Sequence, residues 1–371
     1  MNLLPKIAPR PPPQLRRTDS DALQARSFSN RWRGALARSH LVRAVRPWGG
    51  LATCLMYHRI CADKAEHDDV IEGFAPNSEL SVTVGAFDEQ MAFVSKHFNC
   101  VSLPEAIQQL AAGMLPARSL VVTFDDGYLD NLSLALPILR KHSVPATVYI
   151  ATGMIDQADL PWWYELEDLL AKGDRFSLDW NKQHLHFSTT DAERKMKAFH
   201  TLNPMLKLMD PVEQARFMGL LRDGSIKRRQ PKHQLMNRDQ LLELAADPLI
   251  TIGAHTHNHL ALRSLCPIRL RQEMIRSKEL LEEWLSRPIE HLAYPFGGEA
   301  HASDREFSAA AEVGFSSAVT TRLGHFQAFH KNHLLALPRI GIGYQDCMGR
   351  FEWKLSGLYS MVRRPISRLA C

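Results

Sequence analysis

Two stretches of the sequence bring carboxylate and imidazole side chains close together along the chain. In LVVTFDDGY, residues 120–128, an apolar run that predicts a buried strand ends in Asp125 and Asp126. In IGAHTHNHLAL, residues 252–262, a second apolar run is followed by His255 and His259. Two imidazoles and one carboxylate are a common ligand set for a catalytic divalent metal, and they leave coordination positions open for water. The two stretches therefore predict one metal site.

The paired aspartates indicate a division of roles at such a site. Gly127 permits a sharp turn that brings both carboxylates to one place. One of them can bind the metal while the other accepts a proton from water, and the cation offsets their mutual repulsion. The alternative is an Asp-Gly turn with a helix N-cap. A helical turn after the second run would set His255 and His259 on one face, with His257 supporting them from behind.

Short apolar runs alternate with helical stretches from residue 51 onward, which predicts a parallel sheet. Seven such runs predict an α/β fold of the distorted (β/α)7 barrel kind, whose chemistry gathers where the strands end. The strand candidates are residues 51–58, 99–103, 119–126, 146–152, 249–256, 291–296 and 316–321. The residues near predicted strand ends are His58, Asp125, Asp126, His255, His259 and Arg339, with the turn AYPFGG of residues 293–298.

Helical periodicity marks the segments between the strands. Phe87, Met91, Val94 and Phe98 form one apolar stripe, and residues 131–142 and 267–286 have the same pattern. Asn237 and Gln240 form a capping box before another helix.

An insertion at about residues 155–235 interrupts this rhythm, with a predicted hairpin around FSLDWNKQHLHF and a polar helical run over residues 190–223. Long insertions on a barrel rim commonly cap or shape an active site. Trp162 and Trp163 within it could line such a site and stack on the rings of its ligand. The alternative is that they form the small core of the insertion itself.

Positive charge is concentrated in the first 50 residues, a predicted, partly disordered tail. This tail carries ten Lys or Arg and two Asp, a net charge of +8, and since the whole chain carries +5 the remainder carries −3. The remainder is therefore not a basic nucleic-acid-binding domain. Residues 28–42 and the C-terminal segment 346–371 have basic amphipathic patterns, which suit either peripheral membrane contact or packing on the protein. No secretory signal or membrane-spanning run is visible, so we expect a cytoplasmic or membrane-peripheral location.

Two of these stretches also resemble motifs of the polysaccharide deacetylases, also called NodB-homology domains or carbohydrate esterase family 4. TFDDGY, residues 123–128, resembles the first motif, and HTHNH, residues 255–259, resembles the second. The resemblance covers about residues 51–345 apart from the insertion. It implies a barrel that hydrolyses N-acetyl or O-acetyl groups of an amino-sugar polysaccharide or its precursor, an acetylated glycan. It further implies a general base at Asp125 and a divalent metal, usually zinc, bound by Asp126, His255 and His259.

The third and fifth motifs depart from the family pattern. Ala293 stands where an arginine normally orients the base, and Arg339 of LPRI stands where a histidine normally acts as the acid. We hypothesise that Arg339 takes the place of the missing arginine and that His58 donates the proton to the leaving amine. The alternative for His58 is a histidine hydrogen-bonded at the end of the first strand.

Substrate contacts are expected from residues beside these motifs. Tyr128 would offer its backbone N–H to the oxyanion, and Tyr294 and Pro295 of AYPFGG, with Trp162 and Trp163, would contact the glycan. Two other functions stay open: a non-catalytic glycan-binding barrel, suggested by the departures, and a metallo-amidohydrolase acting on a small substrate. The paired acids argue against the first of these, because binding alone does not need both.

Overall fold

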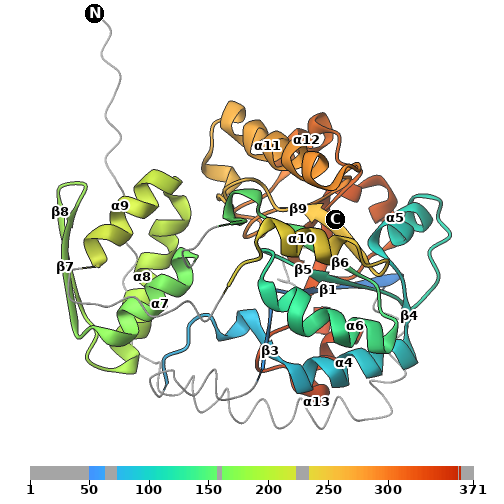
Figure 1. Ribbon diagram of the computed structural model, residues 1–371, viewed down its shortest axis with the longest axis horizontal. Coiled ribbons are helices and arrows are strands. Elements are labelled where there is room, and N and C mark those ends of the chain that lie inside the picture. The colour runs from blue at the N-terminus through green and yellow to red at the C-terminus, as the bar shows by residue number, and fades with distance from the viewer. Residues whose placement is uncertain (1–49, 63–72, 157–160, 223–233, 358, 361–371) are drawn as a thin grey trace, which may run out of the picture.

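Seven parallel strands close on one another to form the central barrel (Figure 1). The computed structural model describes residues 50–62, 73–156, 161–222, 234–357 and 359–360. Strand β5 pairs with β1 as well as with β6, which closes the ring. The predicted (β/α)7 barrel is confirmed. Around it the strands are β1 (Ala52–Tyr57), β12 (Leu337–Gly341), β11 (Ser317–Leu323), β10 (His291–Ala293), β9 (Ile250–Ala254), β6 (Ala146–Ile150) and β5 (Ser119–Phe124).

One of the seven predicted barrel strands is wrong. The run at residues 99–103 supplies only the two-residue edge strand β4 (Asn99–Cys100), beside the start of β5. The seventh barrel strand is β12, which the strand prediction missed. Pro338 within it lacks a backbone N–H, and proline is unusual inside a central strand.

Helices surround the barrel and supply the outer half of its main core. The predicted stripe on α4 is buried at Phe87, Met91 and Val94, and the predicted capping box begins α10. Residues 131–142 form a π-helical turn (Asn131–Ala135) followed directly by α6. The helices are α4 (Val84–His97), α5 (Leu103–Ala111), α6 (Leu136–His142), α10 (Arg238–Ala245), α11 (Pro267–Leu285), α12 (Asp304–Val313) and α13 (Met348–Leu355).

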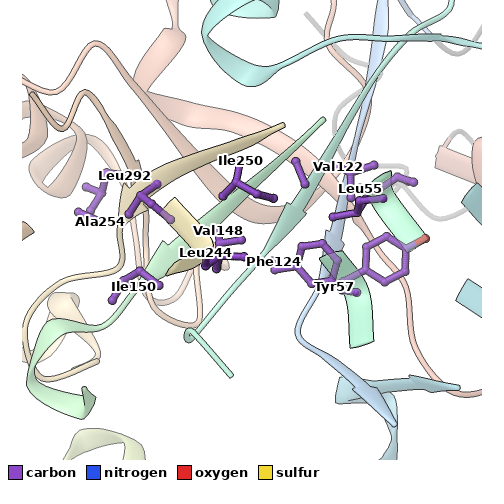
Figure 2. Close-up of a cluster of buried hydrophobic side chains, with 14 of the residues drawn as sticks. Leu55, Tyr57, Val122, Phe124, Val148, Ile150, Leu244, Ile250, Ala254 and Leu292 are labelled. Atoms are coloured by element: carbon purple, nitrogen blue, oxygen red, sulfur yellow. The ribbon is translucent and has the colours of Figure 1, made fainter. Parts of the chain in front are cut away.

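Alternation along β5 decides where Asp125 points. Val122 and Phe124 belong to the large core between strands and helices, together with residues such as Tyr57 of β1 (Figure 2). Val121 belongs to the core that also contains Tyr149 of β6, on the other side of the strand. Because successive side chains alternate across a strand, Asp125 continues the side of Val121 and faces the interior of the barrel at its carboxyl end.

The insertion forms a lobe beside the barrel with its own apolar core, drawn in green at the left of Figure 1. Its hairpin alternates buried and exposed residues along β7, as expected when one face covers a core. The predicted polar helical run is two helices, because Asp210 caps a second helix that starts at Pro211. The elements are α7 (Trp162–Lys172), β7 (Arg175–Trp180), β8 (Gln183–Ser188), α8 (Ala192–Leu208) and α9 (Pro211–Leu221).

The two amphipathic terminal segments have different outcomes. Residues 28–42 lie outside the described residues, as do residues 361–371. Helix α13 packs on the barrel, since Phe351 and Leu355 belong to the main core and Lys354 is buried against Asp346. Among the described residues, no helix is both long enough and apolar enough to span a membrane.

Candidate active site

Three buried side chains converge at the carboxyl end of the barrel. The ligand atoms of Asp126, His255 and His259 all lie within 4.8 Å of one another. Asp126 Oδ1 is 3.4 Å from His255 Nε2 and 3.3 Å from His259 Nε2, yet it accepts no hydrogen bond from the described residues. A buried carboxylate oxygen facing two imidazole nitrogens without a hydrogen bond fits a set of metal ligands.

His255 is oriented by the residue that departs from the expected motif. Its Nδ1 is 2.7 Å from the carbonyl oxygen of Ala293 on β10. If Nδ1–H donates to that carbonyl, Nε2 keeps its lone pair and faces Asp126, which is the arrangement of a metal-binding imidazole. Ala293, which stands where the family motif has an arginine, thus contributes its backbone carbonyl oxygen to the site.

The HTHNH segment bends instead of forming the predicted helical turn. Residues 255–261 have no helical structure, and both Thr256 (φ +63°) and His259 (φ +53°) have left-handed backbones. Asp126 (φ +76°) and Gly127 (φ +81°) have the same conformation in the other motif. The sharp turn predicted at Gly127 is confirmed. Non-glycine residues rarely adopt this conformation, and such strain is concentrated at functional sites.

Asp125 is held away from this triad by Arg339. The guanidinium donates to both carboxylate oxygens at 2.7 Å, and also to the Thr123 hydroxyl and the Thr320 carbonyl. Both Arg339 and Asp125 are almost completely buried. The two adjacent aspartates therefore face different cationic groups.

Burial opposes ionisation of both aspartates, but neighbouring positive groups outweigh it. Arg339 lowers the pKa of Asp125, and the imidazoles, with His259 the stronger influence, hold the pKa of Asp126 well below its usual range. Burial lowers the pKa of His259, whereas at His255 the two carboxylates outweigh burial and raise the pKa. Both acids are ionised at neutral pH, and a metal ion would compete with protons for His255.

His58 borders Asp125 on the side that solvent reaches. Its Nε2 is 4.0 Å from Asp125 Oδ2, and its side chain is 17% exposed. The backbone carbonyl of His58 accepts a hydrogen bond from Asn131, which fixes the segment. No hydrogen bond among the described residues involves the His58 ring, so the ring is available to exchange a proton.

The paired tryptophans of the insertion lie behind His259. The Trp163 ring centre is 5.1 Å from that of His259, and its Nε1–H donates to the Tyr128 hydroxyl. Trp163 and Tyr128 are buried together in one small apolar cluster, against which half-buried Trp162 packs. Trp163 therefore belongs to the core that joins the insertion to the site.

The AYPFGG turn contributes a residue that sequence analysis passed over. Tyr294 is fully buried, packs on Phe307 and donates its hydroxyl to Leu335 O, so its side chain is not placed to contact a substrate. Pro295 is also buried. Phe296 is partly exposed, and its ring centre lies 4.8 Å from that of His259. The sequence signal that could have indicated Phe296 is its position in the AYPFGG turn.

Glu273 of α11 holds the HTHNH segment from outside the barrel. Its two carboxylate oxygens accept hydrogen bonds from the backbone N–H and the side-chain amide of Asn258, both at 2.7 Å. Its backbone carbonyl accepts a third hydrogen bond from His257 N–H. Nothing in the local sequence distinguishes Glu273 from the other glutamates of this helix.

Replacing Glu273 with glutamine should weaken metal binding by about 10–100-fold, the usual effect of losing an outer hydrogen-bond partner. The amide loses one acceptor, so the bend between His255 and His259 is held less firmly. Metal titration of Glu273→Gln measures this. Glu279→Gln, an exposed change on the same helix, is the control and should match the wild type. Equal affinities in all three proteins would contradict the prediction.

Replacing Arg339 with methionine should lower the free energy of unfolding by about 3–5 kcal/mol at neutral pH, because an unpaired carboxylate is left buried. Arg339 lowers the pKa of Asp125, so its stabilisation is present above the unfolded-state pKa of about 3.9 and is lost as the pH falls through the lower folded-state value. Denaturant unfolding of metal-free protein at neutral and acidic pH measures the difference. The double variant with Asp125→Asn should regain much of the loss, and no recovery would argue against the ion pair as its cause.

Known proteins of one family resemble this chain. The family model described as polysaccharide deacetylase matches residues 112–202 and 223–318. The Bacillus subtilis protein YxkH, which is named after the same family, is 22% identical over 290 residues, covering 78% of this chain and 70% of that protein. A poly-β-1,6-N-acetyl-D-glucosamine N-deacetylase of Staphylococcus aureus is 32% identical over 111 residues, which are 29% of this chain and 38% of that enzyme.

Solved structures share the fold. The Streptococcus pyogenes deacetylase PplD, determined in complex with acetate, aligns with a TM-score of 0.54 at 22% identity, covering 82% of this chain and 97% of that one. The polysaccharide deacetylase BC0361 of Bacillus cereus aligns with a TM-score of 0.51 at 18% identity, covering 82% and 68%.

Proposed function

The chain belongs to the polysaccharide deacetylase family and is a hydrolase of that type, and we propose that it removes acetyl groups from an amino-sugar polysaccharide or its precursor with the help of a divalent metal. The observation that carries the proposal is the separation of the two adjacent carboxylates. Asp126 faces two imidazoles and Asp125 faces Arg339. A glycan-binding protein without activity has no need of this arrangement.

The metal proposed for the site is zinc, held by Asp126, His255 and His259. Two imidazole nitrogens and a carboxylate oxygen suit zinc and leave room for water and substrate. The buried Asp126 oxygen without a hydrogen bond supports this ligand set. When bound, the cation would polarise the acetyl carbonyl and lower the pKa of water.

Asp125 is proposed as the general base. Arg339 keeps it ionised and fixes its orientation with two hydrogen bonds, the role hypothesised for the arginine missing at position 293. An ionised, oriented carboxylate beside the reacting water can take its proton. Arg339 itself is fully buried beneath Asp125, so it acts by positioning the base.

Breakage of the C–N bond requires a proton on the leaving amine, and His58 is proposed to donate it. Its Nε2 lies 4.0 Å from Asp125 Oδ2, and the ring makes no hydrogen bond among the described residues. The Tyr128 backbone N–H, which follows the two aspartates, is proposed to stabilise the oxyanion. Trp162, half-buried with its ring centre 5.5 Å from that of Trp163, is proposed as the aromatic residue of the insertion that contacts the glycan.

Removal of the metal tests the proposal. Purified protein should contain about one divalent metal per chain, and it should release acetate from N-acetylated oligosaccharides. Dialysis against a chelator should abolish acetate release, and added zinc should restore it. Acetate release that is unaffected by metal removal would refute the mechanism, and no release from any acetylated glycan would refute the function.

A further inference from the structure

Lys207 is a half-buried cation that the insertion places beside the candidate active site. It lies at the C-terminal end of α8, and its Nζ is 4.8 Å from the centre of the Phe296 ring. The other neighbour of that ring is His259, whose ring centre is 4.8 Å from that of Phe296. Lys207 therefore contacts the same phenylalanine ring as His259, a proposed metal ligand.

No negative group among the described residues balances this charge. Lys207 takes part in none of their ion pairs, and Asp210, the nearest acid along the chain, caps α9 and pairs with Arg269 at 3.6 Å. His301, whose ring centre is 5.5 Å from that of Phe296, adds no negative charge. Burial lowers the pKa of Lys207, as expected for a partly desolvated ammonium. A partly buried, unpaired cation is costly to the fold, and the face of one phenylalanine offsets little of that cost.

We propose that Lys207 binds an anionic group, a carboxylate or a phosphate, on the glycan close to the acetyl group that is removed. This inference rests on the proposed function and narrows it to an acidic glycan. Lys207 is not suited to binding the product amine, because deacetylation makes that amine cationic and a nearby ammonium repels it. An acidic substituent of the substrate would instead supply the negative partner that Lys207 lacks among the described residues. A charge-assisted hydrogen bond in a partly desolvated place is among the stronger polar contacts.

The test compares three N-acetylated oligosaccharides of equal length: a neutral chitin oligosaccharide, a hyaluronan oligosaccharide carrying carboxylates, and a chitin oligosaccharide phosphorylated on its primary hydroxyls. Acetate release gives kcat/KM for each, and quenching of tryptophan fluorescence gives the binding of each independently of turnover. Wild type should prefer one acidic substrate over the neutral one by about 10–100-fold. Which acidic substrate is preferred decides between carboxylate and phosphate.

Lys207→Met should bring that preference to near unity, Lys207→Glu should reverse it, and added salt should weaken it in the wild type. Lys197→Met, an exposed change on the same helix, is the control and should keep the wild-type preference. Equal losses for neutral and acidic substrates in Lys207→Met would show that Lys207 only supports Phe296, and would overturn the inference. An unchanged preference would overturn it too. Absence of acetate release from every substrate overturns the proposed function instead, and the binding arm then still tests Lys207.

Discussion

Asp125→Asn should reduce kcat for acetate release by about 10²–10⁴-fold, the range expected for loss of a general base. The amide keeps the shape of the carboxylate and can still accept a hydrogen bond from Arg339. It cannot take a proton from water. Steady-state kinetics on an N-acetylated oligosaccharide measure the effect, with KM expected to change little because the residue is not proposed to bind the glycan.

Metal content separates this result from a damaged site. Asp125 faces Arg339 and not the triad, so Asp125→Asn should keep about one metal per chain. Asp126→Asn, the same change one residue along, should lose the metal as well as activity. If the two variants behaved alike in both measurements, the division of roles between the neighbouring carboxylates would be wrong.

His255→Ala should reduce metal content from about one per chain to near zero, and acetate release should fall to background. The substitution removes the imidazole that Ala293 O orients toward Asp126, leaving two of three ligands. The loss of affinity should exceed the 10–100-fold typical of an outer partner such as Glu273. Elemental analysis after gel filtration measures the bound metal.

The same substitution at His200, exposed on α8, is the control and should leave metal content unchanged. A His255→Ala variant that retains full metal content would place the metal elsewhere.

The affinity of the wild-type protein for the metal should also fall as the pH is lowered below neutrality. The carboxylates raise the pKa of His255, so protons compete with the cation there.

The two motifs and most of the barrel could be predicted from the sequence because their signals are local. TFDDGY begins in the last two residues of a strand whose residues are all buried, and HTHNH directly follows another strand, so both were expected where barrel strands end. The stripe on α4 and the capping box of α10 are likewise patterns within one segment. Strand β12, which contains LPRI, was missed because Pro338 is unusual inside a central strand. Its pairing with β1 and β11 identifies it as a strand, and that pairing is visible only in the structure.

Residue types and spacing by themselves determined the chemistry available here: two adjacent acids, a pair of histidines and a barrel to hold them. Only the tertiary structure decided which acid faces Arg339 and that Ala293 orients His255 through its backbone carbonyl. It also decided that Glu273 and Lys207 approach the site. The physical reason is that these contacts join different elements of the chain, from 15 positions apart for Asn258 and Glu273 to 214 for Asp125 and Arg339. Closure of the barrel and the alternation of side chains along its strands set which of those segments meet.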